Sequence, residues 1–251
     1  MNAVKQASFL HDLFVPVCKH LDKNPPRILY GQSVSEILDF PFNGKKKMGE
    51  IYKIVKAHYP KHYPELLEVV NKVIKMNKIW FSQRSGVAAD CQNEFQFLDL
   101  AVHASAHKCA IELAHEAVHV WDLWNFSNTN ILEEAAPRTA EKLLSDNFKK
   151  DLGLETDALF KTKLVHSIWM DNPSFMEKCK ASKRPSKTEM FFHSHFLGTL
   201  ASILLTDMIN AKEIKFNDIL HKKGEPPLLT KMKNWGIDGN ALKQSVKSYL
   251  A

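Results

Sequence analysis

The sequence predicts an α+β fold that is predominantly α-helical and carries a small sheet. Apolar residues recur at three- and four-residue spacing along most of the chain, a pattern typical of helices. Two short stretches between residues 78 and 100 are instead rich in aromatic and branched residues, which favours strands. The 251 residues, of which 45% are hydrophobic, can bury a substantial core. We expect a single domain over residues 1–251, with a helical subregion 1–77, a core 78–211 and a C-terminal helical region 212–251.

The N-terminal part predicts four helices. Their expected ranges are 3–22, 33–40, 47–58 and 64–77. Pro16 interrupts the first of them, and the paired prolines of HYPKHYP separate the last two. Three consecutive lysines, Lys45, Lys46 and Lys47, stand at the start of the third helix. Such a run is usually a solvated helix face, and contact with nucleic acid or phosphate is the less favoured interpretation.

The two expected strands cover residues 78–83 (KIWFSQ) and 94–100 (EFQFLDL). Gly86 and the polar residues 90–93 separate them, as a turn or loop would. A hairpin packed beneath the following helix is the simplest arrangement of this pair.

Residues 104–125, ASAHKCAIELAHEAVHVWDLWN, predict a helix, because apolar positions recur at helical spacing and neither Pro nor Gly occurs. His115 and His119 are four residues apart within it, so their imidazoles lie on one face and could bind one ion. Glu116 projects beside that pair, where a carboxylate can accept a proton from a metal-bound water. These three residues together suggest a metallohydrolase, and zinc suits such a pair of imidazoles.

The run HEAVH resembles the HExxH signature of the zincin metallopeptidases, which lies on the active-site helix of that family. The metzincin branch continues with Gly at position 122 and His at position 125, whereas this chain has Asp122 and Asn125. The gluzincin branch therefore fits better. Its third zinc ligand is a Glu from a following helix, often in a stretch E-x-E-A-x-R-x-A. The chain reads EEAAPRTA over residues 133–140, and the resemblance implies Glu133 as that ligand.

Helical periodicity favours the same residue. If the helix continues through this stretch, Glu133 shares a stripe with the apolar residues that follow it. A buried carboxylate needs a partner, and zinc would be one. Glu134 remains the alternate ligand, and Glu141 or no Glu ligand at all are further alternatives. In a simpler interpretation Glu133 closes a capping box, while Glu134 forms a solvated pair with Arg138. Pro137 would kink this helix unless it lies in the first turn.

The resemblance implies a zinc-dependent metalloprotease that hydrolyses peptide bonds in a protein or peptide substrate. Three protein ligands, His115, His119 and Glu133, leave a fourth position on zinc for water. Glu116 would be the general base that takes the proton of that water and returns it to the leaving amine. In zincins an edge strand before the active-site helix commonly binds extended substrate by strand addition, and the strands expected here precede the helix.

Three further residues are candidates for stabilising the transition state or orienting a ligand. Asp122 follows His119 by three residues and could accept a hydrogen bond from a ligand imidazole, or it could be a surface carboxylate. His193 and His195 lie in a long apolar segment for which we predict a central buried helix over 187–211. Either could donate to the oxyanion of a tetrahedral intermediate, as a downstream His does in several gluzincins. Because they are two residues apart, both cannot easily face one ion.

The remaining elements are also expected to be helical. Their ranges are 155–170, 173–180, 215–222 and 238–249, separated by Gly and Pro residues. The basic segment 178–187 is expected to be a mobile surface loop, with a patch for an anionic partner as the less favoured interpretation.

The composition limits the partners and the compartment. The formal net charge is +6, from 34 Lys and Arg against 28 Asp and Glu, which could favour an acidic substrate or an anionic surface; nucleic acid is not expected as a partner. The four cysteines form no CxxC pair, which fits a reducing compartment. Neither a Sec-type signal nor a run of about 18 apolar residues occurs, so we expect no membrane span. A cytoplasmic protein, or an effector exported by a specialised secretion system, fits these features.

Two other hypotheses stay open. The protein could be a helical binding protein in which HEAVH is coincidental or vestigial and the lysine-rich patches contact an acidic partner. It could also be a zinc hydrolase that cleaves a bond other than a peptide bond, because the site chemistry is similar. Metal analysis separates the first of these from an enzyme, and substrate screening separates the second.

Overall fold

The structure is a computed structural model of the chain. The residues that it describes are 3–26, 44–75, 79–82, 89–92, 97–101, 105–125, 132–154, 157–181 and 193–251. The helix predicted at 33–40 and most of the basic segment 178–187 lie outside these ranges.

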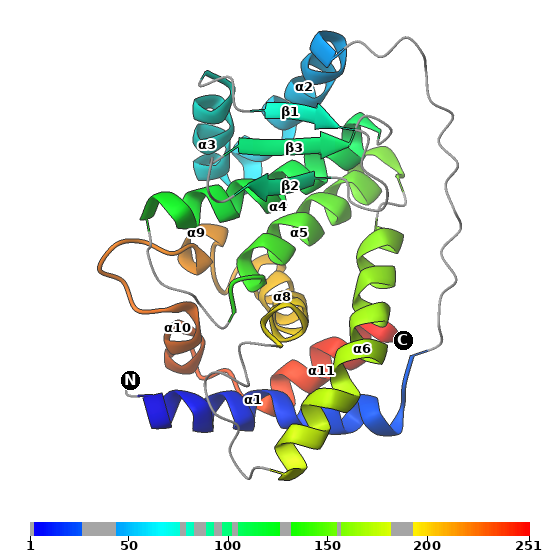
Figure 1. Cartoon of the computed structure of the whole chain (residues 1–251), viewed down its shortest axis with the longest axis vertical. Coiled ribbons are helices and arrows are strands. Elements are labelled where there is room, and N and C mark those ends of the chain that lie inside the picture. Colours follow the sequence, from blue (N-terminus) through cyan, green and yellow to red (C-terminus); the bar gives the residue numbers. More distant parts are fainter. Residues whose placement is uncertain are drawn as a thin grey trace.

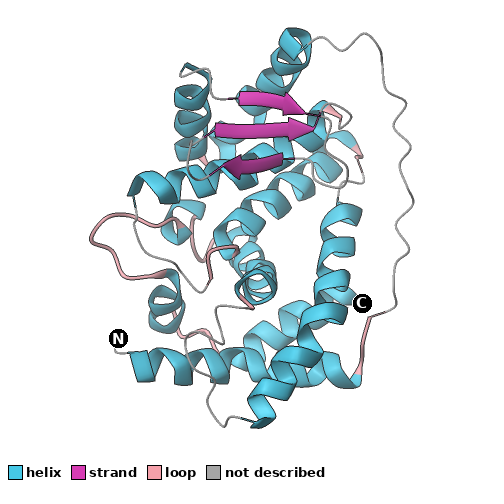
Figure 2. Cartoon of the chain, in the orientation of Figure 1, coloured by secondary structure: helices cyan, strands magenta, loops and turns pink. Residues whose placement is uncertain are grey.

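Helices dominate the described residues (Figures 1 and 2). In chain order they are α1 (Ala3–Lys23), α2 (Gly44–His62), α3 (Pro64–Lys75), α4 (Ala106–Asn125), α5 (Ala135–Leu152), α6 (Asp157–Ala181), α8 (Ser194–Asn210), α9 (Phe216–Ile219), α10 (Leu228–Asn234) and α11 (Gly239–Leu250). The strands are β1 (Ile79–Ser82), β2 (Ala89–Gln92) and β3 (Phe97–Ala101). None of the described helices combines the length and the apolarity that crossing a membrane requires.

The α+β class predicted from the sequence is wrong, because the architecture is that of an all-α protein. Helices of up to 25 residues and their connections build the described hydrophobic core, whereas each strand is only four or five residues long. The prediction of the fold class treated two short aromatic stretches as a sheet that forms its own layer of the structure. Strands of this length add an edge to a helical molecule, and the helices form the layers.

The strands pair at one edge of the molecule, beside α2, α3 and α4 (Figure 1). β1 pairs with β3 in parallel, and β2 pairs with β3 antiparallel. The two expected strands, β1 and β3, are neighbours in the order β1-β3-β2, but their parallel pairing excludes a hairpin; β2, which the sequence did not predict, lies between them in the chain. Both β2 and β3 lie against α4, so this edge borders the helix that carries HEAVH.

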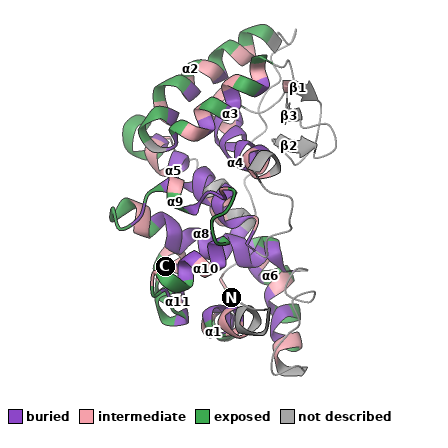
Figure 3. Cartoon of the chain, turned by 90° about the vertical axis from the view of Figure 1, so that its left-hand side faces the viewer, coloured by how far each residue is buried: buried purple, intermediate pink, exposed green. Residues whose placement is uncertain are grey.

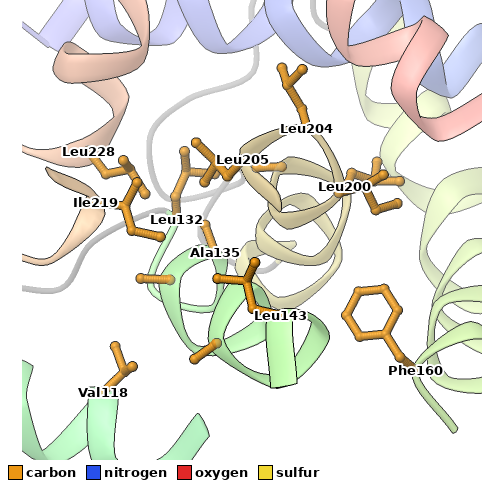
Figure 4. Close-up of a cluster of buried hydrophobic side chains, with 14 of the residues drawn as sticks. Val118, Leu132, Ala135, Leu143, Phe160, Leu200, Leu204, Leu205, Ile219 and Leu228 are labelled. Carbon is orange, nitrogen blue, oxygen red and sulfur yellow. The ribbon is translucent and has the colours of Figure 1, made fainter. Parts of the chain in front are cut away.

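The centre of the molecule is a stack of three helices, in which α4 packs on α5 and α5 packs on α8. Figure 4 shows the buried side chains around it, among them Val118 of α4, Leu143 of α5 and Leu200 of α8. The sequence predicts a central buried helix here, and α8 is buried almost continuously from Ser194 to Thr206. This confirms the expectation for the part of that segment which the structure describes.

The two ends of the chain close the opposite side of the molecule, where α1 packs along α11 and against α6 (Figures 1 and 3). α1 continues through Pro16, where we expected an interruption. Gly239 at the start of α11 lies so close to α1 that a Cβ there would overlap the carbonyl oxygen of Asp12 and lie 2.7 Å from Cγ of Pro16. A proline deprives the carbonyl four residues before it of its helical amide partner, and this is the carbonyl that α11 approaches.

Candidate metal centre

α4 carries two imidazoles that meet at their Nε2 atoms. His115 and His119 are one helical turn apart, and their Nε2 atoms are 3.2 Å apart. The ring planes are inclined by 69°. The His115 side chain is 6% exposed and the His119 side chain is 23% exposed. The helix therefore brings together the two ring nitrogens that the sequence singled out.

Glu134 adds a carboxylate to this pair. It is the N-cap residue of α5 and the last residue of the turn over 132–134, and Pro137 stands in the first turn of α5, where a missing amide costs no helical hydrogen bond. One oxygen of Glu134, Oε2, lies 3.4 Å from Nε2 of His115, and the other, Oε1, lies 3.4 Å from Nε2 of His119. These three side chains form a group that could hold a metal ion.

Glu133, the ligand preferred from the sequence, does not join this group. Its Oε1 atom accepts a hydrogen bond of 3.1 Å from the hydroxyl of Ser194 at the start of α8. The apolar-stripe argument assumed a helix through residue 133, but α5 begins at Ala135, so helical spacing does not apply to Glu133. The carboxylate that lies at the imidazoles is that of Glu134, the alternate candidate.

The two imidazole nitrogens and the carboxylate lie close to the spacing of a zinc site, with a different oxygen of Glu134 nearest to each imidazole, and one ligand atom from each residue can be chosen so that all lie within 4.8 Å of one another. Zinc bonds of about 2.0–2.1 Å place neighbouring ligand atoms of a tetrahedron roughly 3.3 Å apart. The separations here are 3.2 Å between the two Nε2 atoms and 3.4 Å from each Nε2 atom to an oxygen of Glu134. In the part of the chain that the structure describes, Glu134 Oε2 is buried and accepts no hydrogen bond, which is costly for a carboxylate. The residues present therefore fit a cation at their centre.

A second carboxylate faces the far side of His115. Its Nδ1 atom lies 3.4 Å from Oε2 of Glu141 in α5. A proton on Nδ1 that points at this carboxylate leaves the lone pair of Nε2 for the centre of the group. Arg138 donates to the same oxygen of Glu141 at 2.6 Å, and its Nε atom is 3.5 Å from Oε2 of Glu134. The simpler interpretation had Glu134 and Arg138 as a solvated pair, but their side chains are only 4% and 16% exposed and both lie at the site.

Burial and neighbouring charges set the protonation of the group. Burial, together with the positive charge of Arg138, lowers the pKa of His115 to about 4. Burial also opposes a charge on His119, but the hydrogen bond and the negative charge of Glu134 outweigh it and raise the pKa of that ring. Burial would raise the pKa of Glu134, yet the two histidines and Arg138 hold it well below its usual range. A neutral His115 and an ionised Glu134 are the forms that bind a metal ion.

Acidic groups gather around this point. Glu112, Glu116, Glu134 and Glu141 are all buried, and Arg138 lies among them with its pKa raised: burial alone would lower that pKa, but Glu141 and Glu134 outweigh it. Buried negative charge is costly unless cations compensate it. A divalent cation would reduce this excess.

A glycine allows α8 to approach the N-cap of α5. A Cβ at Gly198 would lie 2.7 Å from Cβ of Glu134 and 2.9 Å from the backbone nitrogen of Ala135. Both distances are shorter than atoms of this kind tolerate. α8 therefore presses directly on the residue that supplies the carboxylate, and this contact fixes the position of Glu134.

Glu116, the expected general base, lies beside the group without belonging to it. Its Oε1 atom is 3.9 Å from Nε2 of His115, and its side chain is 9% exposed. A separation of this size suits a carboxylate that acts on a water molecule next to the metal.

The two histidines near the start of α8 differ in their relation to the group. His195 places Nδ1 3.4 Å from Oε1 of Glu134, although its side chain is 70% exposed. His193 is buried, and its ring packs edge to face on Phe175 with the centroids 5.5 Å apart. Exposure rises from His115 through His119 to His195, so solvent reaches the group from the side of His195. His195 is therefore the one of the two that lies at the exposed side of the group.

Asp122 lies against a residue that the sequence did not single out. Its Oδ1 atom is 3.4 Å from Nδ1 of the buried His221, and Trp121 donates to the backbone carbonyl of His221 at 2.7 Å. The carboxylate that faces the Nδ1 atom of a candidate ligand, His115, is therefore that of Glu141 and not that of Asp122. These contacts fasten the segment before α10 to the last turns of α4.

Glu134 and Glu141, which the sequence analysis kept as alternates to Glu133, and Arg138 share a signal in the sequence. Glu134, Arg138 and Glu141 are spaced by four and three residues, which places them on one side of a helix. Pro137 indicates that this helix starts only a few residues earlier. Together these two observations favour Glu134. Gly198 and His221 come from distant segments, and no pattern in the sequence marks them.

Comparisons of the chain with protein-family models, with curated proteins and with solved structures give no match.

Proposed function

We propose that the protein is a zinc-dependent metallopeptidase. The observation that carries this proposal is the meeting of two imidazole nitrogens, of His115 and His119, with the carboxylate of Glu134, and with Glu116 beside them. Two imidazole nitrogens and one carboxylate are a ligand set typical of catalytic zinc, which keeps a fourth position open. The resemblance of HEAVH to the zincin signature supports the same assignment, with Glu134 as the third ligand.

The residues around the centre have separate tasks in this reaction. Zinc, when bound, supplies a Lewis acid that acidifies a water molecule and polarises a substrate carbonyl. Glu116 accepts the proton of the water on its carboxylate and returns it to the leaving amine. Glu141 and Arg138 hold the orientations of His115 and Glu134. His195, at the exposed side, donates a hydrogen bond to the carbonyl oxygen as negative charge develops there.

An extended protein or peptide segment fits the surroundings of the centre. β2 is at one edge of the described sheet, and it lies against α4. Edge strands present backbone groups to which an extended chain can add. A substrate bound in this way would run past the helix that carries Glu116.

The variant Glu116→Gln tests the proposal. We expect it to bind one zinc per chain, as the wild type does, and to lose at least about 100-fold in peptide hydrolysis, the contribution typical of a general base. Zinc is measured by atomic absorption on protein without a His tag, and hydrolysis by mass spectrometry of a mixed peptide library. Undiminished hydrolysis by Glu116→Gln would refute the mechanism. Wild-type protein that binds no zinc would instead favour a helical binding protein.

A further inference from the structure

One helix carries almost all of the net positive charge of the chain. α2 contains six lysines and one glutamate, a net charge of +5, whereas the whole chain has a net charge of +6. The remaining residues are therefore close to neutral as a set. The basic character of this protein is a local feature, and local charge acts on partners more strongly than the same charge spread over a surface.

Four of the six lysines of α2 share one exposed side, and Figure 3 shows exposed residues along the length of this helix. Four exposed lysines form what we call the lysine stripe: Lys45, Lys46, Lys53 and Lys56. At about 100° per residue they fall within roughly 100° of arc, and they extend over about 16 Å of the helix axis. Gly49 lies between them with nothing within 4 Å of the place where a Cβ would stand. The stripe is therefore open to a large, flat partner.

The opposite side of α2 is anchored in the core. Ile51, Val55 and Tyr59 are buried, and the hydroxyl of Tyr59 donates to the backbone carbonyl of Ala110 in α4 at 2.7 Å. α2 also packs on α3. The backbone that carries the stripe is held in place before any partner arrives, which lowers the entropic cost of binding.

The start of α2 conflicts with the electrostatics of the helix itself. The N-terminus of a helix carries partial positive charge and favours Asp or Glu in the first turn. α2 has no acidic residue in its first turn, and Lys45, Lys46 and Lys47 stand there instead. Local conflicts of this kind are expected at functional positions. An anion bound at this end would relieve the repulsion.

The side chains of the stripe favour a diffuse anionic surface over nucleic acid. α2 has no arginine, the residue that reads phosphate and base edges with two parallel hydrogen bonds. Its tyrosines do not offer a platform for bases: Tyr59 is buried, and Tyr52 donates to Asn71 and lies under Lys56. A cluster of four to eight lysines on one helix is typical of binding to anionic phospholipids.

We propose that the lysine stripe of α2 binds the headgroups of an anionic phospholipid bilayer. The contact is peripheral, because the apolar side of α2 faces the core and no described helix could span a membrane. Charge therefore supplies the attraction, and binding weakens as salt is added. The stripe shares no residue with the metal centre, so the two functions are independent.

Charge reversal at three positions tests this proposal. Lys45→Glu/Lys53→Glu/Lys56→Glu takes the net charge from +6 to 0. The matched control Lys150→Glu/Lys223→Glu/Lys247→Glu reverses three exposed lysines on other parts of the chain and reaches the same net charge. Binding is measured by co-sedimentation with phosphatidylcholine vesicles, with and without phosphatidylserine.

The wild type and the control should sediment with the vesicles that contain phosphatidylserine and not with neutral ones. The stripe variant should bind at least about 100-fold more weakly, because each lysine near such a surface contributes about fivefold. Equal binding by the two reversed proteins would overturn the proposal, since total charge would then be responsible. Binding to a nucleic acid without binding to either vesicle would overturn it too. Circular dichroism confirms folding, and Lys45→Gln/Lys53→Gln/Lys56→Gln provides a milder variant with a smaller expected loss.

Discussion

The carboxylate of Glu134 connects the parts of the candidate site. It faces the two imidazoles of α4, the guanidinium of Arg138 and the exposed ring of His195. Because it is buried, its charge depends on these partners, and a metal ion bound at the group would add to their effect. An amide at this position would keep the shape of the side chain and remove the charge.

Glu134→Gln should therefore weaken zinc binding by at least about 100-fold, more than the loss typical of residues that only support a ligand. Glu133→Gln is the matched control, because the carboxylate of Glu133 neighbours that of Glu134 in the sequence but contacts Ser194 and not the imidazoles. We expect the control to change the affinity by less than about threefold. Competition with a chromophoric chelator measures both. If Glu133→Gln lost zinc and Glu134→Gln kept it, Glu133 would be the third ligand, as the sequence predicted.

Single residues of this centre differ in how far the sequence could predict them. The meeting of His115 and His119 follows from helix geometry alone, because residues four apart share a face wherever the helix begins. The choice between Glu133 and Glu134 depends on the first residue of α5, since a shift of one position turns a side chain by about 100°. Sequence patterns locate helix starts less closely than this, so the third ligand required the structure.

The crossing of α5 and α8 depends on the missing side chain of Gly198. Gly198→Ala would press a methyl group against Glu134 and the backbone of Ala135, and overpacking of this kind costs about 1–3 kcal/mol. We expect a lower melting temperature and, because Glu134 moves, weaker zinc binding. Gly49→Ala is the control: it lies in helix α2 with open space around it, so the replacement should stabilise by up to about 1 kcal/mol. Unchanged zinc affinity in Gly198→Ala would contradict the role given to this contact.

Where α2, α4 and α5 meet, two histidines pack their edges on one phenylalanine. The ring centroids of His58 and His107 are 5.0 Å and 5.1 Å from that of Phe148. Burial lowers the pKa of both rings; at His58 the charge of Lys61 adds to this effect and that of Asp151 opposes it. The folded protein therefore favours the neutral form of each ring.

The double variant His58→Gln/His107→Gln should reduce the sensitivity of the fold to acid. Both pKa values lie below the ordinary 6.5, so the unfolded chain takes up protons more readily than the folded one. Stability that is present above about pH 6.5 is then lost as the pH falls through that value. The melting temperature of the wild type should decrease more between about pH 7 and about pH 5 than that of the variant. If calorimetry gave the same decrease in melting temperature for the wild type and the variant, protonation of these rings would not affect stability.

Helices were easier to predict than their ends and their connections. Pro16 and Pro173 were each expected to interrupt a helix, yet α1 and α6 continue through them. Packing of an apolar face over several turns outweighs the loss of one hydrogen bond. α10 is only seven residues long, and no periodic pattern of that length stands out in a sequence. The parallel pairing of β1 with β3 is a long-range contact, which local propensity does not encode.

In the molecule as a whole, the candidate metal centre lies where the central helices meet. α4 provides the imidazoles, α5 provides the carboxylate, and α8 contacts that carboxylate through Gly198. The same three helices pack on one another around the buried cluster of Figure 4. A metal ion bound there would connect elements of the core, and an ion that binds only the folded state stabilises all of it.

Removal of zinc should therefore destabilise the whole molecule. At a free zinc concentration 100 times the dissociation constant, binding stabilises the fold by about 2.7 kcal/mol. For a chain of this size that amounts to roughly 5–10 °C in melting temperature between zinc-saturated and chelator-treated protein. Glu116→Gln should keep this shift, because Glu116 is not a ligand, and Glu134→Gln should lose it. If zinc did not change the melting temperature of the wild type, a protonated His119 and an ionised Glu134 would form an ion pair with each other. This ion pair, and not a metal ion, would then hold the helices together at this point.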